Sequence, residues 1–188
     1  MNVFAIVGPS GSGKSSLVKS LASIGFTTLV EDYLNSCPER FSNKHLLSKW
    51  NWVALWLTRV WDFRQQGTII LVTNRFPLEV VPYATSGVFL LEPIKHTLEE
   101  LEDYGVFIRT IYLQVPLDIC LDRCKRRLRT EPHRKAYGEN NREFIKSVYA
   151  FYEKGIGNLW DFTIDTRGKS IGEVTEEAKT IIEGVAYE

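Results

Sequence analysis

One stretch decides the fold of this chain: Gly8-Pro9-Ser10-Gly11-Ser12-Gly13-Lys14-Ser15-Ser16. It contains a glycine, four further residues and then Gly-Lys-Ser, which is the pattern of a phosphate-binding loop. The apolar run at residues 3–7 predicts a strand before the loop, and residues 14–24 predict a helix after it. Strand, loop and helix in this order are the setting that the motif requires. We therefore predict that the chain binds a nucleoside triphosphate.

The residue types of this loop suit a polyphosphate ligand. Glycines let the backbone turn so that successive N–H groups point at phosphate oxygens, and the following helix adds the positive end of its dipole. Lys14 is expected to reach the β- and γ-phosphates of ATP, and the Ser15 hydroxyl to ligate Mg²⁺. The predicted ATP-binding residues of the loop are Gly8, Ser10, Gly11, Ser12, Gly13, Lys14, Ser15 and Ser16.

Length and composition are those of one globular domain over residues 1–188, with 44% apolar and 24% charged residues. The formal net charge is zero, so no overall basic field draws the chain to nucleic acid or to an anionic membrane. No apolar run approaches the roughly 18 residues of a membrane span. The phosphate-binding loop starts too early to leave room for a signal peptide, and three cysteines form no disulfide framework. We expect a cytoplasmic location.

Strand-like and helix-like runs alternate along the chain. Strands are predicted at 3–7, 26–30, 68–73, 106–115 and 160–164, and helices at 14–24, 45–66, 94–104, 116–127, 141–154 and 171–184. Alternating units of this kind predict a three-layer α/β fold with a mainly parallel five-stranded sheet. Ligands of such sheets bind beyond the carboxyl ends of the strands.

Several charged residues follow predicted strands and are expected to meet in that cleft. Glu31, or its neighbour Asp32, can accept a proton from an attacking hydroxyl while the γ-phosphoryl group is held in line. Arg75 can neutralise charge that spreads over the transferred group. Asp165 and Arg167 follow the last predicted strand and are expected near ATP.

The long helix at 45–66 carries an aromatic and cationic face. Trp52, Trp56 and Arg59 stand at i, i+4 and i+7, so they share one side of the helix. Such a face can stack on a nucleobase and bind a nucleotide. Aromatic residues at helical spacing also commonly pack in a core, and the sequence leaves both roles open for the two tryptophans.

A basic segment at residues 123–138 is predicted to form a lid over the triphosphate. Arg123, Arg127 and Arg129 are expected to clamp phosphate charge and to exclude water. Lys125, Arg134 and Lys135 are expected on a solvated face of the same segment.

These residues together resemble the P-loop deoxynucleoside kinases and the related thymidylate kinases. The segment 120–131 is similar to the family's lid, in which arginines spaced four and then two apart precede a carboxylate, here Glu131, which we expect to bind substrate. The resemblance implies that Glu31 is the general base, that Arg75 and Arg59 bind substrate, and that Asn51 or Trp52 reads the base. It also implies a homodimer. Asn74 stands where the family has an acid before the arginine, which removes one expected partner of Mg²⁺.

Three functions are compatible with this sequence. The first is ATP-dependent phosphoryl transfer to a nucleoside or nucleoside monophosphate, with a deoxypyrimidine favoured. The second is a kinase that acts on a modified base in DNA, with the base stacked on the tryptophans. The third is a nucleotide-binding regulator without turnover, because the acid after the third strand is replaced by Asn74. The first is the leading prediction.

Overall fold

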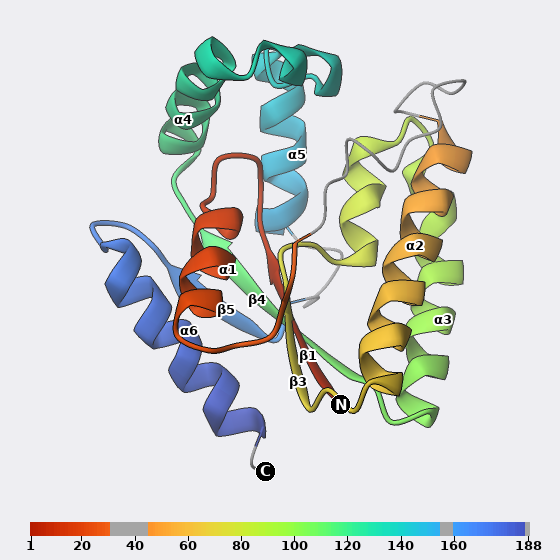
Figure 1. Ribbon diagram of the computed structural model, residues 1–188. Helices are drawn as coiled ribbons and strands as arrows, with labels where there is room; N and C mark the ends of the chain where they lie inside the picture. Colours follow the sequence, from red (N-terminus) through yellow and green to blue (C-terminus); the bar gives the residue numbers. More distant parts are fainter. Residues whose placement is uncertain (31–44, 155–159, 187–188) are drawn as a thin grey trace.

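A parallel five-stranded sheet forms the centre of the protein. The computed structural model describes residues 1–30, 45–154 and 160–186, and within them the strand order is β2-β3-β1-β4-β5 with every neighbouring pair parallel (Figure 1). The strands are β1 (Asn2–Val7), β2 (Thr28–Leu29), β3 (Ile70–Thr73), β4 (Phe107–Gln114) and β5 (Phe162–Asp165). The predicted fold class is confirmed.

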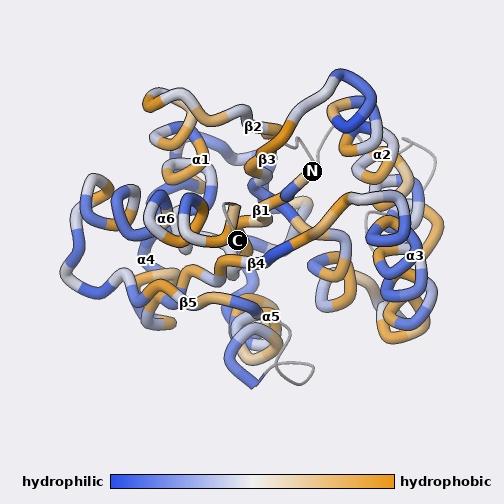
Figure 2. Tube along the Cα trace, turned by 90° about the horizontal axis from the view of Figure 1, so that it is seen from below, coloured by the Kyte–Doolittle hydropathy of each residue, from blue (hydrophilic) through white to orange (hydrophobic). Residues whose placement is uncertain are grey.

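Helices cover both faces of the sheet (Figure 2). Side chains of the central strand β1 alternate between two cores: Phe4 and Ile6 pack with α1 (Lys14–Ser23) and α6 (Ile171–Ala186). Val3, Ala5 and Val7 pack into the other core, which includes residues of α2 (Leu46–Gln65), α3 (Leu91–Asp103) and α5 (Arg142–Lys154). The apolar run of β1 is continuous because a parallel strand at the centre is buried on both faces.

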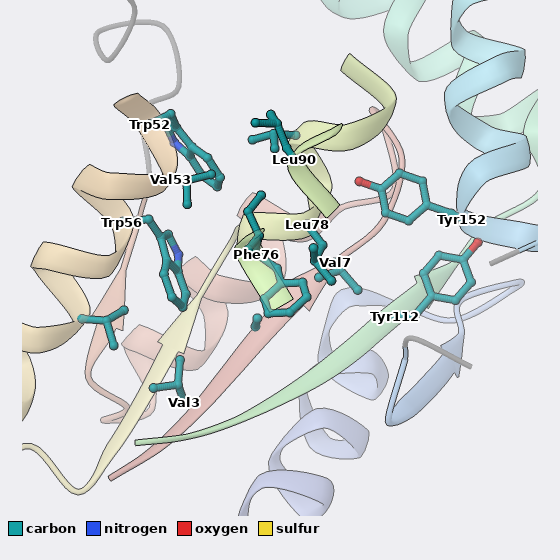
Figure 3. Packing of buried hydrophobic residues seen from close by; sticks show 14 of the residues in the cluster. Val3, Val7, Trp52, Val53, Trp56, Phe76, Leu78, Leu90, Tyr112 and Tyr152 are labelled. Carbon is teal, nitrogen blue, oxygen red and sulfur yellow. The ribbon is translucent and has the colours of Figure 1, made fainter. Parts of the chain in front are cut away.

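The larger core is built around two tryptophans of α2. Trp52 and Trp56 are almost completely buried, and Figure 3 shows them pointing from α2 toward Phe76, Leu78 and Leu90. These residues lie in or beside two 3-10 segments, η1 (Pro77–Tyr83) and η2 (Gly87–Leu90). Trp56 also donates its Nε1–H to the carbonyl oxygen of Arg75 at 3.2 Å. Both tryptophans therefore pack in the core, and their predicted role in stacking on a nucleobase stays a prediction.

The predicted lid lies beyond the carboxyl end of β1 (Figure 1). It consists of the second half of α4 (Leu117–Thr130) and of a 3-10 segment, η3 (Pro132–Tyr137), which packs on α4. The helix α4 continues to Thr130, beyond its predicted end, and β2 is shorter than the run that predicted it. Within the described parts of the chain, no helix has the length and apolarity needed to cross a membrane.

Candidate active site

A cleft of about 540 Å³ opens at the carboxyl ends of the strands. Its walls come from the phosphate-binding loop, α2, the end of β3, η1, the lid and the loop after β5. Ligand sites in proteins have volumes in this range. Elements that are far apart in the sequence therefore enclose one space, at the place where an open parallel sheet binds its ligands.

The phosphate-binding loop packs closely against the lid helix α4. Gly11 has a φ of +84°, and a Cβ atom there would lie 2.9 Å from the carbonyl oxygen of Cys120. Arg123 donates to the carbonyl oxygen of Gly11 at 3.0 Å. The Oγ of Ser12 is buried at the edge of the cleft and has no hydrogen-bond partner among the described residues. A buried hydroxyl without a protein partner suits a loop that is shaped to receive a ligand.

Replacing Gly11 by alanine should weaken ATP binding about tenfold or more. The new methyl group meets backbone of α4, which cannot move as a flexible side chain does, and a left-handed backbone costs a residue other than glycine about 1–3 kcal/mol. ATP titration of the folded variant measures the loss. Gly184→Ala is the control, because no heavy atom lies within 4 Å of its added Cβ. Unchanged ATP affinity in Gly11→Ala would contradict this account of the loop.

Lys14 is buried at the centre of the cleft. Its Nζ donates to the carbonyl oxygen of Gly8, and to that of Pro9 at 3.1 Å. Burial, together with the nearby charge of Arg75, lowers the pKa of Lys14 to about 8. The ammonium group therefore lies in an environment that disfavours its charge, and a phosphate oxygen would be a stronger partner than two carbonyl groups.

ATP binding should take up a proton at alkaline pH. At pH 8.5 most of the unliganded protein carries a neutral Lys14, and the phosphates restore its charge because they raise its pKa. ATP affinity should then fall as the pH rises above 8, by up to about tenfold per pH unit. Calorimetry at pH 8.5 in buffers of different ionisation enthalpy measures the proton uptake, and at pH 6.5 the Lys14 contribution should vanish. An ATP affinity that is constant from pH 7 to 9.5 would refute the expectation.

Arg75 and an unpredicted carboxylate, Glu79, form part of the cleft wall. The Nε of Arg75 has no hydrogen-bond partner among the described residues, and both side chains line the cleft. Glu79 is 2% exposed and accepts hydrogen bonds from the backbone N–H of Gly8 at 3.4 Å and of Phe76 at 2.9 Å. It also accepts from the hydroxyl of Tyr152 at 2.5 Å, and Figure 3 shows Tyr152 reaching across from α5.

Glu79 holds the end of β1 next to the cationic groups of the cleft. Its negative charge raises the pKa of Arg75, against the opposing effect of burial. Asn74 is buried in the cleft and brings no charge. The sequence has no carboxylate directly before Arg75, but the structure places that of Glu79, four residues after Arg75, nearby. The Glu79 carboxylate accepts hydrogen bonds from protein donors.

The lid presents a different set of arginines from the predicted one. Arg123 and Arg127 line the cleft, whereas Arg129 is exposed and is absent from its described lining. Residues four apart share a face of an α-helix, but a residue two positions further on points to the opposite side. Arg134 was expected on a solvated face, and this expectation was wrong: Arg134 lines the cleft and pairs with Glu131 and Glu139.

Of the other predicted site residues, only some line the cleft. Trp52 lines it, whereas Asn51, Trp56, Arg59 and Glu131 are not among its described lining residues. Asp165 is bonded to Arg167 through both carboxylate oxygens, and Thr166 and Lys169 line the cleft beside them. The predicted roles of these residues in binding stay predictions. Glu31 and Asp32 lie outside the described residues.

Sequence reasoning missed several residues that the structure places in the cleft wall or near it. Glu79 and Glu139 are buried carboxylates in the cleft wall, and Lys49 is buried on α2, where burial and the charge of Arg75 lower its pKa to about 7. Lys49 lies three residues before Trp52 on the same helix face, and that spacing is the signal that could have found it. Glu79 lies within the 3-10 segment η1 and Glu139 follows η3, and such segments give no signal of this periodicity.

Comparison with known proteins gives a result at the level of the fold. No protein-family profile and no curated protein sequence matches the chain. Deoxyadenosine kinase from M. mycoides with bound dCTP superimposes with a TM-score of 0.63 at 19% identity, over 98% of this chain and 100% of that chain. Its complex with dATP gives 0.61 at 19% identity, over 97% and 100%. The YorR protein from Bacillus subtilis, in complex with phosphorylated GDP, gives 0.59 at 12% identity, over 99% and 98%. The chain therefore has the deoxynucleoside kinase-like fold that its sequence resembles.

Proposed function

We propose that this chain is an ATP-dependent kinase that transfers the γ-phosphoryl group to a nucleoside or nucleoside monophosphate, with deoxypyrimidines as the first acceptors to test. One observation carries the proposal: the phosphate-binding loop, Arg75 and the lid arginines all line one cleft, in which Ser12 Oγ and Arg75 Nε have no partner among the described residues. Unsatisfied donors in a cationic cleft suit a polyanionic ligand. The deoxyadenosine kinase neighbours support the same reading.

The described residues have distinct tasks in such a transfer. The backbone of the loop binds the triphosphate, and Lys14 Nζ exchanges the carbonyl groups of Gly8 and Pro9 for phosphate oxygens. Arg75 and Arg127, which both line the cleft, stabilise the negative charge that spreads over the transferred group. The proton of the acceptor hydroxyl goes to Glu31 in this proposal, or to Asp32, both outside the described residues.

The acceptor is proposed to bind between α2 and η1. Trp52, Val80 and Tyr83 line this part of the cleft and provide aromatic and apolar surface for a base. Arg75 lies beside them and can bind either the reacting hydroxyl region of a nucleoside or the phosphate of a monophosphate. This arrangement supports both acceptor classes, and the assay below separates them.

Mg²⁺ is proposed as the metal cofactor, with Ser15 as its ligand in the phosphate-binding loop. The Ser15 hydroxyl is exposed at the cleft, and serine at this position of the loop is a magnesium ligand. No group of three or more His, Cys, Asp or Glu residues suited to a metal ion occurs in the described parts of the chain. Phosphate oxygens, water and Glu31 or Asp32, which lie outside the described residues, would supply the other ligands. When bound, the ion neutralises charge on the phosphates.

A coupled assay of ADP formation tests the proposal. Wild-type protein with ATP and Mg²⁺ is given each common nucleoside, each monophosphate, and single-stranded DNA that carries a hydroxymethylated base. Stimulation by a nucleoside or a monophosphate supports the proposal and identifies the acceptor class. Stimulation by the DNA alone would replace it with a DNA kinase, and no stimulation by any acceptor, with ATP binding intact, would overturn kinase activity.

A further inference from the structure

Glu139 is a buried carboxylate between the lid and the phosphate-binding loop. It follows η3, is 7% exposed and lines the cleft, yet none of the steps above assigns it a task. Burying a carboxylate is costly unless several donors compensate its charge. The groups around Glu139 therefore indicate what it does.

Three donors from different parts of the chain converge on this carboxylate. Arg127 donates from Nε to Oε2 at 3.2 Å and from Nη2 to Oε1 at 2.6 Å, which is a two-point contact along one edge of the guanidinium. Arg134 donates from Nη1 to Oε1 at 3.4 Å. The hydroxyl of Ser10, in the phosphate-binding loop, donates to the same oxygen at 3.4 Å. One side chain thus joins α4, η3 and the loop.

The local sequence directs Glu139 inward. Gly138 has a φ of +77°, and a Cβ atom there would lie 2.6 Å from Cδ1 of Phe144, so the turn admits no larger residue without displacing that ring. Asn141 then accepts a hydrogen bond from the backbone N–H of Phe144 at 3.1 Å at the start of α5. The tight turn between η3 and α5 places Glu139 beside the lid helix instead of in solvent.

We infer that Glu139 is a positioning residue that orients Arg127 for the phosphates of ATP and ties the lid to the phosphate-binding loop. The two-point contact occupies one edge of the guanidinium, and Arg127, which lines the cleft, has further N–H groups with which to meet an anion there besides its contact with the Cys124 thiol. Fixing the side chain in advance removes its ordering from the cost of binding. The inference deepens the proposed function and rests on its assignment of ATP to this cleft.

A double-mutant cycle on ATP affinity tests the inference without requiring turnover. Glu139→Gln keeps the size of the side chain and removes its charge, and it should weaken ATP binding about tenfold or more, the scale of a charge-assisted hydrogen bond. Arg127→Ala should weaken binding at least as much. Since Glu139 acts through Arg127, the double variant should bind ATP no more weakly than Arg127→Ala alone. Calorimetric titration of each folded variant with Mg²⁺-ATP gives the affinities.

Two further variants separate positioning from a general effect on stability. Glu143→Gln is the matched control, because Glu143 is an exposed glutamate of α5 paired with Lys146 at 2.9 Å, and its ATP affinity should equal that of wild type. Glu139→Asp keeps the charge and should recover part of the affinity that glutamine loses. If Glu139→Gln fails to fold, Glu139→Asp replaces it. The cycle then compares the ATP affinities of wild type, Glu139→Asp, Arg127→Ala and the double variant Glu139→Asp/Arg127→Ala.

Two outcomes would overturn the inference. Additive losses in the double variant would show that Glu139 acts independently of Arg127. Tighter ATP binding by Glu139→Gln would show that the carboxylate competes with phosphate for the arginine. Failure of the proposed function gives a different result. The wild-type protein would then bind ATP but phosphorylate no acceptor, and the ATP affinities of all variants in the cycle could still be measured.

Discussion

Lys14→Met should lower phosphoryl transfer by about a thousandfold, the scale seen when a preorganised donor to developing charge is removed. The Nζ of Lys14 lies among the carbonyl groups of Gly8 and Pro9, at the centre of the cleft, and no other lysine of the phosphate-binding loop can replace it. Methionine has a similar length and brings no charge to the phosphates. Initial rates with the acceptor identified by the coupled assay measure the effect.

The same variant should not be less stable than wild type. Burial lowers the pKa of Lys14 to about 8, so the folded protein bears a cost for its charge at neutral pH, which methionine does not incur. A thermal midpoint equal to or above that of wild type, together with the lost rate, would separate chemistry from folding. Lys19→Met, at an exposed position of α1, is the control and should retain full activity. A Lys14→Met variant that keeps a tenth of the wild-type rate would contradict the proposed chemistry.

Glu79→Ala should destabilise the protein by about 3–5 kcal/mol, the cost of leaving buried charges and donors without their partner. The substitution removes the acceptor of the N–H groups of Gly8 and Phe76 and of the Tyr152 hydroxyl. Burial and the Glu79 charge raise the pKa of Tyr152 well above 10, so this hydroxyl remains a donor at neutral pH. The charge of Arg75 also loses its nearby carboxylate.

Urea unfolding measures this free-energy difference. Glu92→Ala is the control: Glu92 is 64% exposed and pairs with Lys95 at 3.1 Å, and an exposed pair of this kind contributes about 0.3–0.5 kcal/mol. A loss below about 1 kcal/mol in Glu79→Ala would mean that water replaces the carboxylate, and that the cleft wall is more hydrated than its burial indicates.

The sequence predicted most of the fold because the relevant signals are local. The run at residues 3–7 and the loop after it specify a strand, a turn and a helix within about twenty residues. The apolar pattern of 68–73 and 106–115 was sufficient to identify two further buried strands. The segment 77–90 was harder, since its 3-10 turns follow prolines and a glycine and show neither helical nor strand periodicity.

The site was predicted less completely, because its contacts join distant parts of the chain. Gly8 and Glu79 are 71 residues apart, and Ser10 and Glu139 are 129 apart. Nothing near a glutamate in the sequence tells which of 23 acidic residues will be buried. Likewise, the spacing of Arg123, Arg127 and Arg129 shows that two share a helix face, whereas only packing shows which face meets the cleft.

By itself, the sequence determined the parallel α/β architecture and the position of the phosphate-binding loop, because hydrophobic periodicity and glycine placement act over a few neighbouring residues. Tertiary structure alone decided that Trp56 packs in the core, that Arg134 lines the cleft whereas Arg129 is exposed, and that Glu79 and Glu139 are buried in the cleft lining. The reason is physical: burial of a charge becomes favourable only when donors from several elements surround it, and folding brings those donors together.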